Sequence, residues 1–276
     1  MIISHKYKFI FIRPSKVGGT SIEIALARNH GDKDIITPIS EFNPDNDEDK
    51  YNHPAKNYKD KEFFNHITPD EVKNKIGNKI WDKYYKFTVV RNPWDQTASR
   101  YWWKRYSKWG KFWWEGKNTI KKVTSNLFNP KAYKFVIGKI RRPKSIVNNL
   151  RKKWTNKNWT DKLYYIYKRG DPGFDYFIRT RSKKWANKYW ENTLYYFDEK
   201  GKPVCDFYIR YENLQKDYEK VCRRLGMPCE KLPKTKNKTR KEKKHYSLYY
   251  NSETREIIHN LFKKEIDYFG YKFERK

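Results

Sequence analysis

Hydrophobic and polar positions near the start of the chain change their spacing within one short stretch. Phe9–Ile12 is an uninterrupted apolar run, which is typical of a buried strand. From Ser21 onward the apolar residues fall at Ile22, Ala25 and Leu26, which is helical spacing. The residues between these two patterns include two adjacent glycines. The stretch therefore predicts a strand, a glycine-containing turn and a helix.

This turn has the properties of an anion-binding site. The first N–H groups of a helix have no intrahelical partner, and the helix dipole places partial positive charge beside them. Gly18 and Gly19 allow the backbone to approach a phosphate. Lys16 adds a full charge, and Thr20 and Ser21 add hydroxyl donors. The order differs from a Walker A loop because the lysine precedes both glycines. An ordinary strand-to-helix turn with a solvated lysine would show the same pattern.

A second transition of this kind follows farther along the chain. The apolar, β-branched run Phe87–Val90 predicts a buried strand, and Asn92 and Pro93 begin the next helix. Arg91 leaves the carboxyl end of this strand, where open α/β sheets bind ligands, and Ser99 lies about two helical turns later. An arginine fork and a hydroxyl suit one phosphate monoester. The alternative is an arginine that pairs with a nearby carboxylate.

The remaining elements are predicted from capping residues and apolar stripes. Residues 29–60 are rich in Asn, Asp and Pro and predict a surface loop. Thr68 and Pro69 suit the start of a helix that Gly77 ends or bends. The C-terminal part predicts a strand at 204–210, a helix at 213–225, a basic loop at 231–245, a helix at about 252–264 and an aromatic tail, FGYKF.

Charge and cysteine content narrow the class of protein. The 276 residues include 63 Lys and Arg against 32 Asp and Glu, and the net charge of +31 favours polyanionic partners. Abundant Lys, Asn, Ile and Tyr also result from an A/T-biased coding sequence, so much of the lysine can be solvated surface. Cys205, Cys222 and Cys229 have neither disulfide nor metal-ligand spacing. With no apolar run long enough to span a bilayer and no recognisable signal peptide, these features predict a cytoplasmic protein.

Residues 104–203 interleave Trp and Tyr with Lys and Arg. Aromatic faces stack on sugar rings while cations meet sulfate or carboxylate groups, and the same mixture suits single-stranded nucleic acid. Bands such as Trp185, Tyr189 and Trp190 at helical spacing also fit ordinary packing. We interpret this segment as an insertion that forms the acceptor side of a site or a lid over it.

Two segments, FIRPSKVGGTS at 11–21 and TVVRNPWDQTAS at 88–99, resemble the cofactor signatures of sulfotransferases that use 3′-phosphoadenosine 5′-phosphosulfate (PAPS). HITPDEV, residues 206–226 and residues 249–273 resemble the branch that contains carbohydrate sulfotransferases. The likeness covers the first helix, about 66–103 and about 204–276. That branch often has P-K-T-G-G-T-S in the first loop. Here Ser15 removes a rigid turn residue and Val17 removes a hydroxyl donor.

The resemblance implies an α/β, P-loop-like three-layer fold with a central, mostly parallel sheet flanked by helices, in a single domain over residues 1–276. It implies PAPS as donor, adenosine 3′,5′-bisphosphate as product, no metal ion, and a hydroxyl acceptor on a glycan that can be acidic. Lys16 and His66 are the implied catalytic residues, and His53 and Glu23 are the alternatives to His66 as base. The implied cofactor contacts are Arg13, Ser15, Lys16, Val17, Gly18, Gly19, Thr20, Ser21, Arg91, Ser99, Asn237, Lys238 and Arg240.

Two other classes of function also fit parts of the sequence. A P-loop-like nucleotide kinase is disfavoured by the position of Lys16 and by the lack of a convincing acidic metal ligand after a strand. A basic nucleic-acid-binding protein with a vestigial phosphate loop would bind single strands with an affinity that falls steeply with salt. The two classes and the sulfotransferase differ in whether they prefer ATP, single strands or adenosine 3′,5′-bisphosphate.

Overall fold

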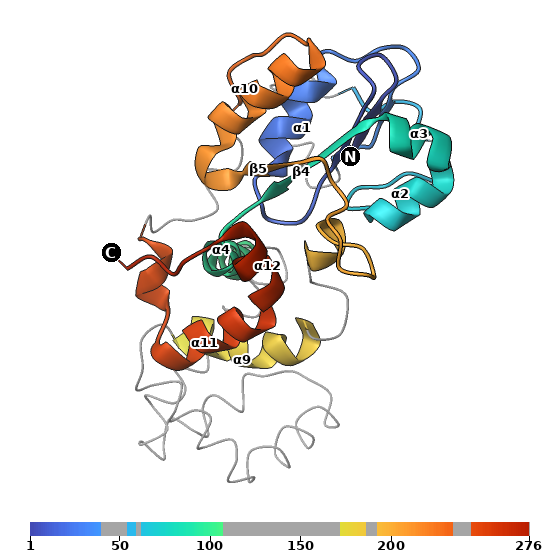
Figure 1. Cartoon of the computed structure of the whole chain (residues 1–276). Coiled ribbons are helices and arrows are strands. Elements are labelled where there is room, and N and C mark those ends of the chain that lie inside the picture. The colour runs from blue at the N-terminus through green and yellow to red at the C-terminus, as the bar shows by residue number, and fades with distance from the viewer. Residues whose placement is uncertain (40–53, 59–61, 107–171, 186–191, 234–243, 276) are drawn as a thin grey trace, which may run out of the picture.

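The computed structural model describes residues 1–39, 54–58, 62–106, 172–185, 192–233 and 244–275. Its centre is a five-stranded sheet of order β3-β1-β2-β4-β5 (Figure 1). The strands are β1 (Ile2–Ser4), β2 (Phe9–Ile12), β3 (Ile35–Ile36), β4 (Tyr85–Val90) and β5 (Phe207–Arg210). β1 is antiparallel to β2 and β3, whereas β2, β4 and β5 are parallel. Only β1 therefore runs against the others among the described strands, which confirms a mixed α/β fold with a mostly parallel sheet.

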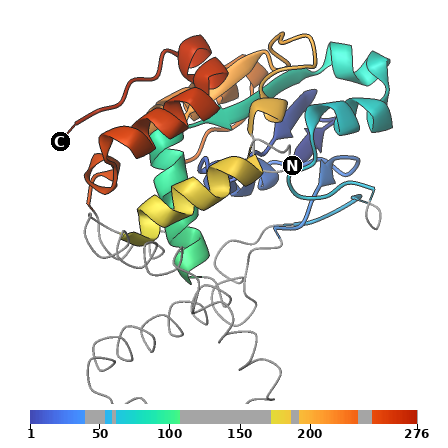
Figure 2. The same cartoon turned by 90° about the horizontal axis from the view of Figure 1, so that it is seen from below.

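Helices lie around this sheet (Figures 1 and 2). In chain order they are α1 (Gly19–Ala27), α2 (Pro69–Ile76), α3 (Asn78–Lys83), α4 (Pro93–Tyr106), α9 (Pro172–Trp185), α10 (Leu214–Leu225), α11 (Ser252–Leu261) and α12 (Lys263–Phe269). Short 3-10 turns are η2 (Asn192–Tyr195), η3 (Tyr211–Asn213) and η4 (Tyr246–Tyr249). In the part of the chain that the structure describes, no helix is long and apolar enough to cross a membrane.

The alternation of side chains along β2 explains why both faces of the sheet are covered. Phe9 and Phe11 belong to a core that includes residues of α1 and α10. Ile10 and Ile12 belong to the opposite core, which includes residues of α2 and α3. Successive strand residues point to opposite faces, so a strand with helices on both sides is apolar at every position. This is why the run Phe9–Ile12 shows no polar alternation.

A third, largely aromatic core joins α4 to α9 and the C-terminal helices, and Figure 2 shows α9 crossing α4. Tyr101 of α4 packs edge to face on Phe174 of α9, with ring centroids 5.2 Å apart. Phe174 in turn contacts Tyr250, ahead of α11, at 4.8 Å. The described parts of 104–203 therefore pack into the body of the protein. The prediction of an acceptor side or lid falls mainly on residues outside the described ranges.

Several element boundaries differ from the sequence predictions. α1 begins at Gly19, two residues before Ser21, because Gly18 in the left-handed region already starts the turn. The predicted helix at 252–264 is two helices, since the backbone leaves helical geometry at the buried Phe262. The predicted loop at 29–60 contains β3, which pairs with β1. Pairing between distant segments has no local composition signal, which is why β3 was missed.

Candidate active site

The loop between β2 and α1 lies at the carboxyl end of β2 and has an unusual backbone. Lys16 has φ of 63° and Gly18 has φ of 87°, so two residues of this short loop have positive φ angles just before α1 begins. Gly18 is the N-cap of α1, and no side chain from the described part of the chain caps this end through a hydrogen bond. The partial positive charge of the helix dipole is therefore not offset by a capping oxygen. This confirms the predicted strand, glycine turn and helix.

Close packing explains the two glycines. A Cβ on Gly18 would lie 2.6 Å from the ring of Tyr211, the first residue of η3. A Cβ on Gly19 would lie 2.7 Å from Cγ of Arg13. Val17, between the loop lysine and these glycines, is fully buried in the core with α1 and α10. The loop is thus fixed from within by apolar and aromatic contacts.

Arg91 brings the two sequence signatures together. Its Nη1 donates a hydrogen bond to the carbonyl oxygen of Lys16 at 3.1 Å. Its Nε and Nη2 bind Oδ2 of Asp95 at 2.9 and 2.7 Å, so the alternative of a carboxylate partner also holds. The Cζ atom of the guanidinium lies over the ring of Tyr211, 3.8 Å from the ring centroid. These bonds use three of the five N–H donors of the guanidinium.

One face of α4 lies along the loop. Gln96 Nε2 donates to the carbonyl oxygen of Ser15 at 2.8 Å. Nζ of Lys16 lies 5.3 Å from the ring centroid of Trp103, two helical turns after Gln96. Ser99, which is half-buried, shares this face because it is three residues after Gln96 and four before Trp103. Ser99 is therefore carried on the same surface of α4 that contacts Ser15 and Lys16.

Arg13 is a buried residue that connects the end of β2 to the first turns of α1. Its side chain is only 2% exposed, its Nε lies 2.8 Å from Oε2 of Glu23, and its Nη1 donates to Oγ1 of Thr20 at 2.9 Å. Thr20 and the neighbouring Ser21 are both buried, with less than a tenth of their surface exposed. Glu23 is fully buried and paired with Arg13, which disfavours it as a base.

His66 is attached to the same loop. Its ring Nδ1 lies 2.7 Å from the carbonyl oxygen of Arg13, and a carbonyl can only accept, so Nδ1 carries the proton. In the neutral ring the lone pair is then on Nε2. The hydroxyl of Tyr195 donates to the carbonyl oxygen of His66 at 2.6 Å. Burial is the main cause that raises the pKa of Tyr195 to about 12, so this hydroxyl keeps its proton near neutral pH.

Sequence reasoning missed the residues that hold this loop from elsewhere in the chain. Asn192 makes two bonds to the backbone of Ser15, and Gln96, Tyr195 and Tyr211 make the contacts given above. Tyr211 alone had a usable signal, because it directly follows a parallel strand at its carboxyl end. The predicted residues Asn237, Lys238, Arg240 and His53 lie outside the described residues, and Lys16, His66, Arg91 and Ser99 lie on segments that contact one another.

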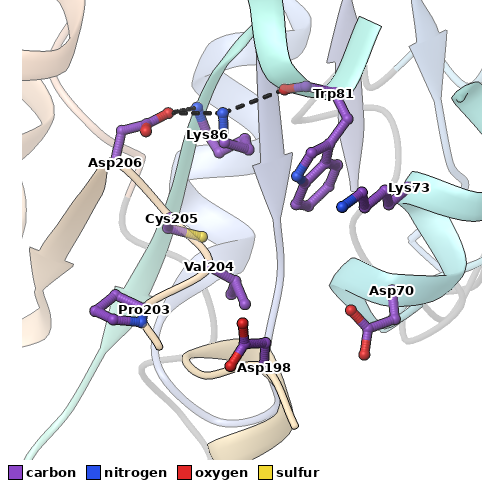
Figure 3. Close-up of a pocket in the computed structure, with 9 residues that line it drawn as sticks. All are labelled: Asp70, Lys73, Trp81, Lys86, Asp198, Pro203, Val204, Cys205 and Asp206. Carbon is purple, nitrogen blue, oxygen red and sulfur yellow. Dashed lines mark hydrogen bonds and ion pairs between the residues drawn. The ribbon is translucent and has the colours of Figure 1, made fainter. Parts of the chain in front are cut away.

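A separate pocket of about 230 Å³ lies at the other end of the sheet (Figure 3). Lys86 and Asp206, which line it, stand at the amino ends of β4 and β5. In Figure 3 the amino group of Lys86 points to Asp206 and to the carbonyl of Trp81. Over the described ranges, no group of three His, Cys, Asp or Glu side chains could hold a metal ion.

Comparisons with known proteins add one finding to this geometry. A family model described as the sulfotransferase family matches residues 1–272 of the 276. Searches of curated proteins and of solved structures found no match. The match includes both loop signatures, both strands that precede them and the C-terminal helices. The chain therefore belongs to the sulfotransferase family, whose members are transferases of sulfuryl groups.

Proposed function

We propose that this protein is a PAPS-dependent sulfotransferase with a P-loop-like three-layer fold, and that it acts on a hydroxyl of a carbohydrate. One observation carries the proposal: Arg91, from the second signature, donates a hydrogen bond to the backbone of Lys16 in the first. Groups suited to the two anionic ends of one nucleotide are thereby held in one place. If the two signatures lay on distant surfaces, they could not bind the two ends of one nucleotide.

The residues at this place fit the donor. The uncapped start of α1 supplies backbone N–H groups and a positive dipole end for the 5′-phosphosulfate. Arg91 keeps two N–H donors beyond its three bonds, and Ser99 stands on the neighbouring face of α4, so both suit the 3′-phosphate. Arg13 serves this site indirectly, by fixing Thr20.

The proposed chemistry divides between Lys16 and His66. When bound, the donor supplies an activated sulfuryl group on a phosphate oxygen. Lys16 stabilises negative charge that develops on the leaving oxygen. His66, oriented by its bond to the Arg13 carbonyl, accepts the proton of the acceptor hydroxyl at Nε2. Sulfuryl transfer thus needs positioning and charge stabilisation from these side chains, and we propose no metal ion.

The choice of acceptor class rests on composition and on the surroundings of Lys16. The net charge of +31 suits an acidic glycan, and Trp103 beside Lys16 is 37% exposed, which suits a sugar ring. A nucleotide kinase is disfavoured because Lys16 precedes both glycines. A nucleic-acid-binding protein accounts for the charge but not for the joined signatures.

Calorimetric titration tests the proposal. We expect adenosine 3′,5′-bisphosphate to bind at least about tenfold more tightly than ATP, because only the first has a phosphate for Arg91 and Ser99. Tighter binding of ATP would favour a kinase. Preferential binding of a single-stranded oligonucleotide, with an affinity that falls steeply with salt, would favour the nucleic-acid-binding alternative.

Replacement of His66 tests its role as base. With saturating donor we expect His66→Ala to lower turnover by about 100-fold or more. His30→Ala is the matched control, because the His30 ring Nδ1 also lies on a backbone carbonyl, that of Ala27 at 2.8 Å, away from the loop. Turnover of His66→Ala within a few-fold of the parent would remove His66 from the mechanism.

A further inference from the structure

Arg100, on α4, is a buried cation that the proposed chemistry does not use. Its side chain is 3% exposed, and none of its three guanidinium nitrogens has a hydrogen-bond partner among the residues that the structure describes. A guanidinium offers five N–H donors and stays protonated in proteins. To bury such a group without partners costs several kcal/mol. A buried guanidinium with this many unsatisfied donors therefore calls for an explanation, and a bound anion is one that its chemistry fits.

The position of Arg100 places it beside the candidate active site. It lies four residues after Gln96 and three before Trp103, so the three share one face of α4. Gln96 and Trp103 both contact the loop. Gln96 binds the carbonyl oxygen of Ser15, and the ring of Trp103 lies near Nζ of Lys16. Arg100 is therefore carried between two side chains that both contact the loop.

The groups that act electrostatically on Arg100 are the last residue of η2, the residue that follows it, and a residue of α12. Burial lowers its pKa, while Glu265, Tyr196 and Tyr195 raise it. Glu265 is itself buried and accepts a hydrogen bond from the Thr193 hydroxyl at 2.6 Å. It attracts the guanidinium from beyond hydrogen-bond distance and so does not satisfy the N–H donors. Tyr195 also binds the backbone of His66, which puts Arg100 on the side of the proposed base.

We propose that Arg100 binds an anionic substituent of the acceptor, a carboxylate or a sulfate. The acceptor is then an acidic sugar rather than a neutral one, and this inference rests on the proposed function. The two anionic ends of the donor already have their own groups at the start of α1 and at Arg91. A planar guanidinium matches a carboxylate or sulfate with two parallel hydrogen bonds. Arg100 is thus a specificity-determining residue on the face of α4 whose Gln96 and Trp103 contact the loop that carries Lys16.

Turnover with matched acceptors tests this inference. We would measure kcat/KM for methyl glucuronide against methyl glucoside, and for methyl galactoside 6-sulfate against methyl galactoside. The wild-type enzyme should prefer at least one acidic member over its neutral parent. Arg100→Gln should lower kcat/KM for that acidic acceptor by at least about tenfold and leave the neutral one within about twofold. Arg100→Lys keeps the charge but loses the planar guanidinium. Its kcat/KM for the acidic acceptor should lie between those of the wild type and Arg100→Gln.

Two controls keep the outcomes separate. Arg179→Gln replaces an arginine on α9 whose partners are Asp175 and Glu253, outside the site, and should leave acceptor preference unchanged. Binding of adenosine 3′,5′-bisphosphate should be the same in wild type and Arg100→Gln, which also reports that the variant is folded. Failure of the wild type to bind this nucleotide would refute the proposed function itself.

Two results would overturn the assignment of Arg100. The first is a wild-type enzyme that shows no preference for either acidic acceptor, which needs no variant. The second is an equal loss of kcat/KM for acidic and neutral acceptors in Arg100→Gln, with Glu265→Gln giving the same loss. That pattern would mean that Arg100 and Glu265 form a buried charge pair with a purely structural role.

Discussion

The two ends of β4 each carry a cation paired with an aspartate, but the two sites differ in what remains available. At the amino end, Nζ of Lys86 binds Asp206 at 3.1 Å and the carbonyl oxygens of Trp81 and Tyr84 at 3.2 and 2.9 Å. The ammonium group thus donates two hydrogen bonds to backbone carbonyls and has a carboxylate as its ion-pair partner. The pocket beside it in Figure 3 is therefore lined by a cation that is already satisfied.

At the carboxyl end, Arg91 is held as firmly but keeps donors for a ligand. Asp95 and the Lys16 carbonyl orient its guanidinium, and the start of α1 adds further N–H groups. Carboxyl ends of parallel strands meet helix N-termini, whereas amino ends meet helix C-termini, so only the first can collect an anion. A hollow on the surface is thus a weaker sign of function than unsatisfied donors that converge.

The largest expected effect separates the two lysines. Lys16→Ala should lower turnover by about 100- to 1000-fold, because it removes the charge beside the leaving oxygen. Lys86→Met, at the other end of β4, should leave turnover within about twofold. Product formation from labelled donor measures both. Comparable losses in the two variants would mean that the carboxyl end has no special role.

The next effect concerns the donor rather than the rate. Arg91→Ala should weaken the binding of adenosine 3′,5′-bisphosphate on the order of 100-fold or more, since a charged group would lose its partner. Isothermal titration calorimetry measures this, with Lys86→Met as the unaffected control. An unchanged dissociation constant would show that Arg91 only serves Asp95 and the loop backbone.

Alanine substitutions at two glycines distinguish the cost of backbone strain from the cost of a steric clash. Gly18 and Gly226 both have left-handed backbone conformations, but a Cβ on Gly226 would meet nothing within 4 Å. Gly226→Ala should therefore cost only the conformational strain of about 1–2 kcal/mol. Gly18→Ala should lower the free energy of unfolding by a further 1–3 kcal/mol or so, because its Cβ meets the Tyr211 ring. Urea denaturation decides, and equal losses would contradict the packing argument.

The smallest effect is on stability at the amino end. Lys86→Met should lower the free energy of unfolding by about 1 kcal/mol, because the Asp206 carboxylate is partly exposed and water screens its attraction to Lys86. The same urea titrations measure it. A loss as large as that of Gly18→Ala would mean that the amino end contributes more to the fold than its exposure indicates.

Local signals predicted those elements whose residues determine their own conformation. Thr68 and Glu71 form the reciprocal hydrogen bonds of a capping box, and Gly77 ends α2 as the sequence indicated. The sequence offered two roles for Arg91, contact with a ligand or pairing with a carboxylate, as if they excluded each other. Asp95 does pair with Arg91, but the pair leaves N–H donors of the guanidinium for a ligand. The break at Phe262 could not be predicted, since nothing in its neighbours excludes a continuous helix.

The residues that hold the site in place could not be predicted because they lie far from it in the sequence. Asn192 reaches the Ser15 backbone across 177 positions, and Tyr195 reaches His66 across 129. Neither residue type is distinctive, and η2 stands in a segment whose aromatic and basic residues suggested a lid. The buried state of Arg100 was equally invisible, because an arginine next to Ser99 on a helix is normally expected at the surface.

The ring of Tyr211 contacts both parts of the proposed nucleotide site. It lies on the guanidinium of Arg91 and also fills the space over Gly18. Because one side chain contacts both places, we expect a change at one of them to disturb the other, so that in the proposed function the two phosphate contacts are coupled. A nucleotide with a single phosphate group then forfeits more than one set of hydrogen bonds, because nothing steadies the empty end. In the proposed function this coupling would favour a nucleotide with two separate phosphate groups over one with a single phosphate group.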